Sequence, residues 1–155
     1  MRRLRHGMWL VALVLLSLNR AAVAQSSTDF SVNQVAATTC PSGEPIAVSG
    51  NLHFTYSFVT DSTTGVNTYQ ISISSNLSAT GQATQTTYAG DNASFAYSFP
   101  TTDSPAQVSL QLGLRLFSQG STPNLMLNQT VNITVDTAGN IGADIPTSST
   151  SCNGS

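Results

Sequence analysis

The chain has 155 residues, of which only 8% are charged, with seven acidic residues against five arginines and no lysine. Four of the arginines (Arg2, Arg3, Arg5 and Arg20) lie in the first 20 residues, so residues 25–155 keep Arg115 alone and carry a net charge of −6. Binding to a phosphate backbone needs clustered Lys and Arg, so this balance argues against nucleic acid as a partner.

The first 24 residues have the features of a secretory signal peptide. A basic start precedes an apolar run over residues 9–18, and Ala22, Val23 and Ala24 form an A-x-A cleavage site. We expect cleavage near Ala24, a secreted or periplasmic protein, and no membrane span after cleavage, because the apolar run is too short to cross a bilayer comfortably. An uncleaved membrane anchor is the alternative. Removing 24 of the 155 residues leaves 131, which suits one domain over residues 25–155.

Two cysteines, Cys40 and Cys152, remain after cleavage. In an exported protein the simplest prediction is one disulfide bond between them. It would close a loop of 112 residues, which the chain-entropy model values at about 4–5 kcal/mol. A metal-binding or catalytic cysteine pair is the alternative, but it lacks a C-x-x-C spacing and a basic neighbour.

The first half of residues 25–155 contains three segments with strand-like alternation. A weak strand is expected over residues 30–38 and is followed by a turn over residues 40–45. Apolar side chains then occupy every second position from Ile46 to Phe58, with a bend at Gly50, and again from Tyr69 to Ile73. Residues 61–65 have hairpin-turn composition. The polar residues 76–87 are predicted to form an edge strand or a loop.

The second half is dominated by residues 106–117, in which Val108, Leu110, Leu112, Leu114 and Leu116 alternate with mostly polar residues. This pattern predicts one long strand with an aliphatic face. Further strands are expected over residues 93–99, 125–135 and 141–145, with turns over residues 118–124 and 136–139. A flexible tail is predicted for residues 146–155.

Short alternating segments without a helical period indicate an all-β domain of about seven to nine strands. We predict a two-layer antiparallel β-sandwich, because alternating apolar faces suit two sheets packed about 10 Å apart. A β-barrel is the alternative.

Few residues offer catalytic chemistry. His53 is the only histidine after residue 24 and lies on the polar face of its strand, so a Ser-His-Asp triad drawn around it has no specificity, and no G-x-S-x-G motif is present. A structural histidine is expected, with no metal or cofactor. The candidate carboxylates for a glycosidase pair or a calcium site lie mostly in turns, where Asp commonly supports the backbone. These are Glu44, Asp61, Asp91, Asp103, Asp136 and Asp144.

The aromatic residues mostly share the apolar face of their strands, which predicts core packing rather than a stacking platform for sugars. Tyr88 and Phe117 are the two expected to lie outside the core.

The turn Cys40-Pro41-Ser42-Gly43-Glu44, with Gly50 and His53 after it and a Cys near the C-terminus, resembles a family of uncharacterised secreted bacterial proteins with a C-x-G-E and G-x-x-H type motif. That family often carries further histidines in its strands, and Asn132 stands where one would be expected. The resemblance implies export and a disulfide-closed β fold, and it adds no activity.

We therefore predict a secreted, non-enzymatic binding or surface-structural module that recognises an extracellular ligand or surface component through loops at one end of a sandwich. A self-assembling surface or adhesive subunit is the alternative, because strand edges without lysine are poorly protected against pairing. A small extracellular hydrolase is the third possibility. The candidate binding loops are marked by Asp61, Gly65, Gly120, Asn124, Asp136 and Gly139.

Overall fold

The structure, a computed structural model, describes residues 24–40 and 43–152. The predicted signal peptide, residues 1–24, lies outside the described residues except for Ala24. The described part of the chain contains eight β-strands and no helix, which confirms the all-β prediction. The strands are β1 (Ala24–Thr38), β2 (Ile46–Thr60), β3 (Asn67–Gly81), β4 (Thr87–Gly90), β5 (Ser94–Thr101), β6 (Ala106–Ser118), β7 (Leu125–Val135) and β8 (Ile141–Cys152).

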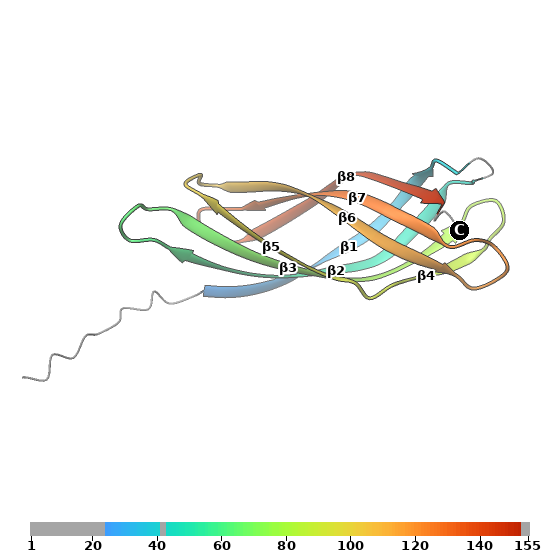
Figure 1. Cartoon of the computed structure of the whole chain (residues 1–155), viewed down its shortest axis with the longest axis horizontal. Coiled ribbons are helices and arrows are strands. Elements are labelled where there is room, and N and C mark those ends of the chain that lie inside the picture. The colour runs from blue at the N-terminus through green and yellow to red at the C-terminus, as the bar shows by residue number, and fades with distance from the viewer. Residues whose placement is uncertain (1–23, 41–42, 153–155) are drawn as a thin grey trace, which may run out of the picture.

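Seven of these strands close into a ring, in the order β2-β1-β8-β7-β6-β4-β3, and β3 pairs back with β2. β5 pairs with β3 beyond the short strand β4. The result is an elongated barrel with turns at both ends (Figure 1). The two-layer sandwich was therefore the wrong prediction, and the barrel alternative describes the fold. Inward and outward side chains alternate in either architecture, so the sequence pattern does not separate them.

Two short pairings close the ring at one end only. β1 and β8 pair in parallel through Ala37 with Ser149 and Thr38 with Thr150, and β4 contributes three residue pairs to β6. The Cys40–Cys152 disulfide lies beside the parallel pairs and confirms the predicted bond. We call this the disulfide end. At the other, open end, which carries the turns over residues 61–66, 102–105 and 136–140, β1 and β8 no longer pair with each other.

The interior is filled by the alternating apolar residues, as predicted. The long strand β6 buries Leu110, Leu112, Leu114 and Leu116, and Phe54 of β2 is fully buried. Completely burying a side chain of this size contributes about 1.5–3 kcal/mol. Gln129 of β7 also points into this apolar interior and has no exposed surface.

Several strand limits differ from the prediction. β1 begins at Ala24 because its polar start pairs with β2 as far as Phe58. Residues 76–81 continue β3, and only residues 82–86 form a turn. The tail predicted from Pro146 onward is the second half of β8. A bulge separates the pairs Asn132–Asp144 and Thr130–Thr147, and the ladder with β7 then resumes. Proline cannot donate a ladder hydrogen bond, so a bulge accommodates it.

Candidate functional site

The predicted binding loops do not gather at one end of the molecule. The turns that contain Gly65 and Gly139 lie at the open end, whereas Gly120 and Asn124 lie in the β6–β7 connection at the disulfide end (Figure 1). The expectation of one loop cluster was wrong because the β6–β7 hairpin turns in the opposite direction from the β2–β3 and β7–β8 hairpins. The Asn124 side-chain oxygen accepts a hydrogen bond from the Ser118 backbone N–H at 3.0 Å and so supports its own loop.

The turn aspartates also serve their own turns. Asp61 Oδ1 accepts hydrogen bonds from the backbone N–H groups of Thr63 at 2.8 Å and Thr64 at 3.2 Å, and these bonds lower the pKa of Asp61. Asp136 likewise accepts bonds from the side chain and backbone of Asn140, which lower its pKa. Gly65 and Gly139 adopt φ angles of 71° and 83°, as the hairpin prediction required. The arrangement is that of structural turns.

Glu44 is a structural carboxylate as well. It accepts hydrogen bonds from the Thr84 hydroxyl and from the backbone N–H groups of Thr84, at 2.9 Å, and Ala83. The Thr84 hydroxyl is the largest of the effects that lower the pKa of Glu44, followed by the Thr84 backbone N–H. The carboxylate thereby ties the β1–β2 loop to the β3–β4 turn and closes the disulfide end.

His53 lies on the exposed outer face of β2, on the polar side of its strand as predicted. Its Nδ1 is 2.8 Å from Asp29 Oδ1 on β1, and Ser74 of β3 is its cross-strand neighbour on the other side. The order carboxylate, imidazole, hydroxyl resembles a catalytic triad. However, β2 pairs along its length with both neighbours, so its backbone N–H groups are engaged in the sheet and are not free to stabilise an oxyanion. The row therefore has no oxyanion hole made of β2 backbone N–H groups.

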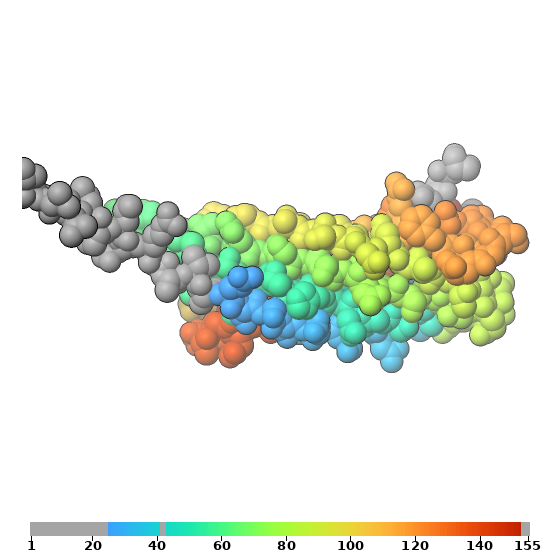
Figure 2. All heavy atoms as spheres, turned by 90° about the horizontal axis from the view of Figure 1, so that it is seen from below, coloured from blue at the N-terminus to red at the C-terminus, as the bar shows by residue number. Residues whose placement is uncertain are grey.

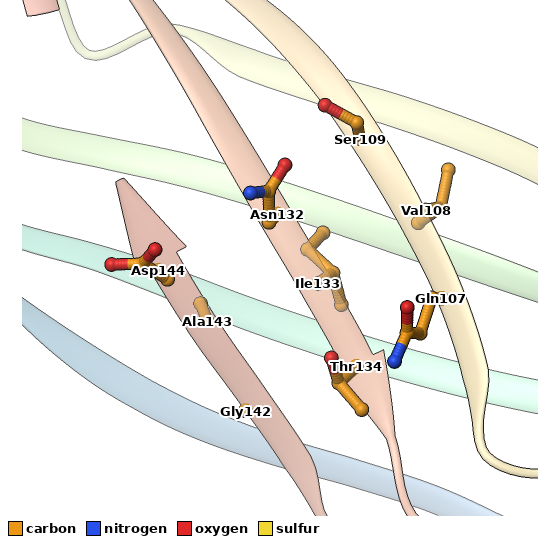
Figure 3. Close-up of a pocket in the computed structure, with 9 residues that line it drawn as sticks. All are labelled: Gln107, Val108, Ser109, Asn132, Ile133, Thr134, Gly142, Ala143 and Asp144. Carbon is orange, nitrogen blue, oxygen red and sulfur yellow. The ribbon is translucent and has the colours of Figure 1, made fainter. Parts of the chain in front are cut away.

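A broad hollow of about 610 Å³ lies on the outer face of β6, β7 and β8, toward the open end (Figure 3). The strand register forms its first row, because Ser109 is opposite Asn132 and Asn132 is opposite Asp144. Side chains directly opposite one another on a sheet have Cβ atoms about 4.5–5.5 Å apart, so one ligand can contact all three. The second row is Gln107, Thr134 and Gly142, and the inward-facing neighbours Val108, Ile133 and Ala143 complete the lining.

The polar side chains of the hollow have free hydrogen-bonding capacity. Among the described residues, none of the five polar side chains in the two rows makes a side-chain hydrogen bond, whereas Gln111 and Thr130, further along the same face, bond to each other at 2.9 Å. Gly142 leaves space in the second row: a Cβ built there would meet nothing closer than a carbonyl oxygen at 3.9 Å. The hollow thus offers two amides, two hydroxyls and one carboxylate to a ligand.

A smaller pocket of about 140 Å³ lies at the disulfide end. Apolar side chains of Ile46, Tyr88 and Leu125 line it together with Glu44 and the disulfide. Tyr88, expected outside the core, is buried here, because β4 turns its side chain into the end of the barrel. Ligand sites usually occupy about 300–1,000 Å³, so the outer hollow is the stronger candidate.

Comparisons with protein-family models, with curated proteins and with solved structures find no match to this chain. The fold and the site together define a disulfide-linked all-β barrel with a polar hollow on its outer face. The described part of the chain holds no cluster of three or more His, Cys, Asp or Glu side chains suited to a metal ion. It also has no helix long and apolar enough to span a membrane.

Asp144 was among the candidate carboxylates in the sequence, and Asn132 was noted through the family resemblance. The sequence did not predict that these two residues lie opposite each other. It missed Gln107, Ser109 and Thr134, which have the outward parity of β6 and β7. The available signal was that the outward positions of β7 and of the first part of β6 carry amides and hydroxyls, with Arg115 the one charged side chain further along that face of β6. The predicted exposure of Phe117 was correct, since 40% of its surface is exposed.

Proposed function

We propose that residues 25–155 form a secreted, non-enzymatic binding module that takes a neutral, polyhydroxylated ligand such as a glycan chain in the outer hollow. The observation that carries this proposal is the pair of side-chain rows with unused hydrogen-bonding groups around Gly142. The signal-peptide features and the disulfide support export, because disulfides persist in oxidising compartments.

The chemistry of the rows suits sugar hydroxyls. The Asp144 carboxylate accepts hydrogen bonds only, so it pairs with hydroxyl donors, whereas the Asn132 and Gln107 amides both donate and accept. Neighbouring hydroxyls on a sugar ring present the same mixture of donors and acceptors. No basic residue lines the hollow, so a phosphorylated ligand finds no compensating charge there.

The lining of the hollow also predicts that affinity increases with the length of the glycan chain. It contains no aromatic ring on which a sugar could stack, so binding rests on hydrogen bonds that each contribute about 0.5–1.5 kcal/mol net. A single sugar would bind weakly, and a longer chain that contacts both rows would bind better.

The test is a thermal melt of the oxidised protein against a panel of bacterial and plant polysaccharides, with and without calcium. A ligand at about 100 times its dissociation constant adds about 2.7 kcal/mol to the free energy of unfolding, a shift of several degrees. A flat panel in both conditions would refute the proposal.

Gly142→Val provides the site-specific arm, because the new side chain fills the hollow without entering a left-handed backbone region. We expect it to abolish the ligand-induced shift and leave the ligand-free melt nearly unchanged. The matched control is Gly113→Val on the outer face of β6, where the nearest atoms to an added Cβ lie 3.9 and 4.0 Å away. If the ligand still raises the melting temperature of the Gly142→Val variant, the ligand binds at another site.

A further inference from the structure

The ring of strands has an open seam between β1 and β8. A groove of about 200 Å³ runs between them where they diverge toward the open end. Figure 2 views the molecule from the side on which the start of β1 (blue) lies near the β7–β8 turn (red-orange). We call this groove the β1–β8 seam. The side chains that line it come from Phe30, Ser31, Val32, Asn33, Gln34, Leu52, Ala143, Asp144 and Ile145.

Both sides of the seam are strand edges with free backbone groups. β1 pairs with β2 on its other side, β8 pairs with β7, and the two strands meet each other only at residues 37–38 and 149–150. Within the described residues no hydrogen bond crosses between residues 24–36 and 141–148. The gap between β5 and β6 differs, because the Tyr97 hydroxyl donates a hydrogen bond to the Gln111 carbonyl at 3.2 Å across it.

The inner lining changes from apolar to polar along the seam. Phe30 and Ile145 pack against the core near the open end, and Leu52 lies behind them, fully buried. Further toward the disulfide end, the Gln34 amide nitrogen and the Ser148 hydroxyl are buried without a hydrogen-bond partner, as are both amide atoms of Gln129 beside Ser148. Buried polar atoms without partners cost about 1–3 kcal/mol each, so a polar group that reaches this end of the seam gains binding energy.

The outer rim is acidic. Asp144 lines the seam from β8, and Asp29 lies on β1 next to the seam residue Phe30. Asp29 already has a partner, because its Oδ1 is 2.8 Å from His53 Nδ1, so Asp144 is the carboxylate that faces an incoming segment. The only arginine beyond residue 24, Arg115, lies on β6. An incoming segment therefore meets negative charge on the outside and an apolar surface on the inside.

We propose that the β1–β8 seam binds an extended, basic peptide segment of a partner protein as an additional strand between β1 and β8. The peptide backbone pairs with both free edges, which is the mode called β-augmentation. Side chains of a strand alternate between faces, so apolar residues of the peptide point inward to Phe30 and Ile145 and basic residues point outward to Asp144. This site adjoins the glycan hollow of the proposed function and shares Ala143 and Asp144 with it, but it takes a different ligand.

A second copy of this chain is a poorer occupant. Beyond residue 24 the chain has no lysine and a single arginine, so it supplies no extended segment with alternating basic residues. Its own strands are also held in the barrel ladders, and a strand that is already paired on the barrel cannot enter between two edges.

The test uses the oxidised protein after signal-peptide cleavage and a short acetylated, amidated peptide of alternating valine and lysine. Heteronuclear NMR should show shift changes at the backbone amides of residues 30–34 and 143–145. A valine–glutamate peptide should bind about threefold or more weakly, as expected for loss of an exposed ion pair. The valine–lysine peptide with N-methyl groups on alternate nitrogens should bind at least about tenfold more weakly, because several backbone hydrogen bonds are lost.

Asp144→Lys should reverse the preference between the lysine and glutamate peptides, and the control Asp103→Lys, in the exposed β5–β6 turn, should not. Equal binding of the N-methylated peptide, or shift changes outside the seam, would overturn the proposal. So would concentration-dependent dimers in sedimentation velocity that exclude the peptide, since a second copy would then occupy the seam. Because Asp144 also lines the hollow, Asp144→Lys is judged by peptide preference alone, and glycan binding is measured with Gly142→Val, a residue that does not line the seam. A glycan shift without peptide binding, or peptide binding without a glycan shift, then shows which of the two proposals fails.

Discussion

Replacing both Cys40 and Cys152 with serine should lower the free energy of unfolding by about 5 kcal/mol in the chain-entropy model. The reason is the size of the closed loop, because the two residues are 112 positions apart. The structure also indicates where the loss of stability should begin, because only two residue pairs join β1 to β8, and these lie beside the disulfide. Losing the bond therefore removes the main restraint on ring closure as well as an entropic restraint on the unfolded chain.

The assay is urea unfolding of the double serine variant against the oxidised protein, with hydrogen exchange as the local readout. For a domain of about 130 residues, 5 kcal/mol corresponds to a fall in melting temperature of roughly 15–20 °C. Exchange should rise first at residues 37–39 and 149–150, before the β2–β3 ladder is affected. A loss below about 1 kcal/mol, or exchange that rises uniformly, would refute the view that the bond secures ring closure.

Three further changes test the packing and the turns. Gly50→Ala should destabilise the protein by about 1–3 kcal/mol in urea unfolding. Gly50 has a φ of 135°, and a Cβ added there would lie 2.2 Å from a carbonyl oxygen of β3. Gly113→Ala is the unstrained control, and an equal loss of stability in that variant would contradict the reasoning. Gln129→Met should raise the free energy of unfolding by about 1–3 kcal/mol, because it removes two buried polar atoms without partners; a decrease would show that the amide is satisfied in solution. The pKa values of Glu44 and Asp136 are lowered in the folded protein, so their contribution to stability is complete above their ordinary values of 4.5 and 3.8 and is lost as the pH falls below them. Replacing both with Gln and Asn should flatten the acid limb of a stability–pH curve, and an unchanged limb would count against these turn hydrogen bonds.

The period-two pattern predicted most of the strands because burial on one face leaves a direct record in the sequence, as in residues 106–117. It did not predict ring closure, since a barrel and a sandwich place the same alternation of side chains on their strands. The β8 extension was missed because the Ser and Thr residues after Pro146 gain their order from pairing with β7, which no local pattern reveals. The hollow was missed for a related reason: Ser109, Asn132 and Asp144 meet only through register across three strands.

The position of the disulfide also determines how the protein would respond to tension. β1 starts at the open end and β8 finishes at the disulfide end, so a pull applied to the two termini follows β1 to Cys40 and crosses directly to Cys152. Residues between the two cysteines carry none of that load while the bond is intact. The load falls on β1, which is already extended and is held along β2 by thirteen residue pairs. Reduction of the bond would place the whole 112-residue loop under load and release up to about 370–400 Å of additional chain, so the disulfide converts an extensible domain into a nearly inextensible link.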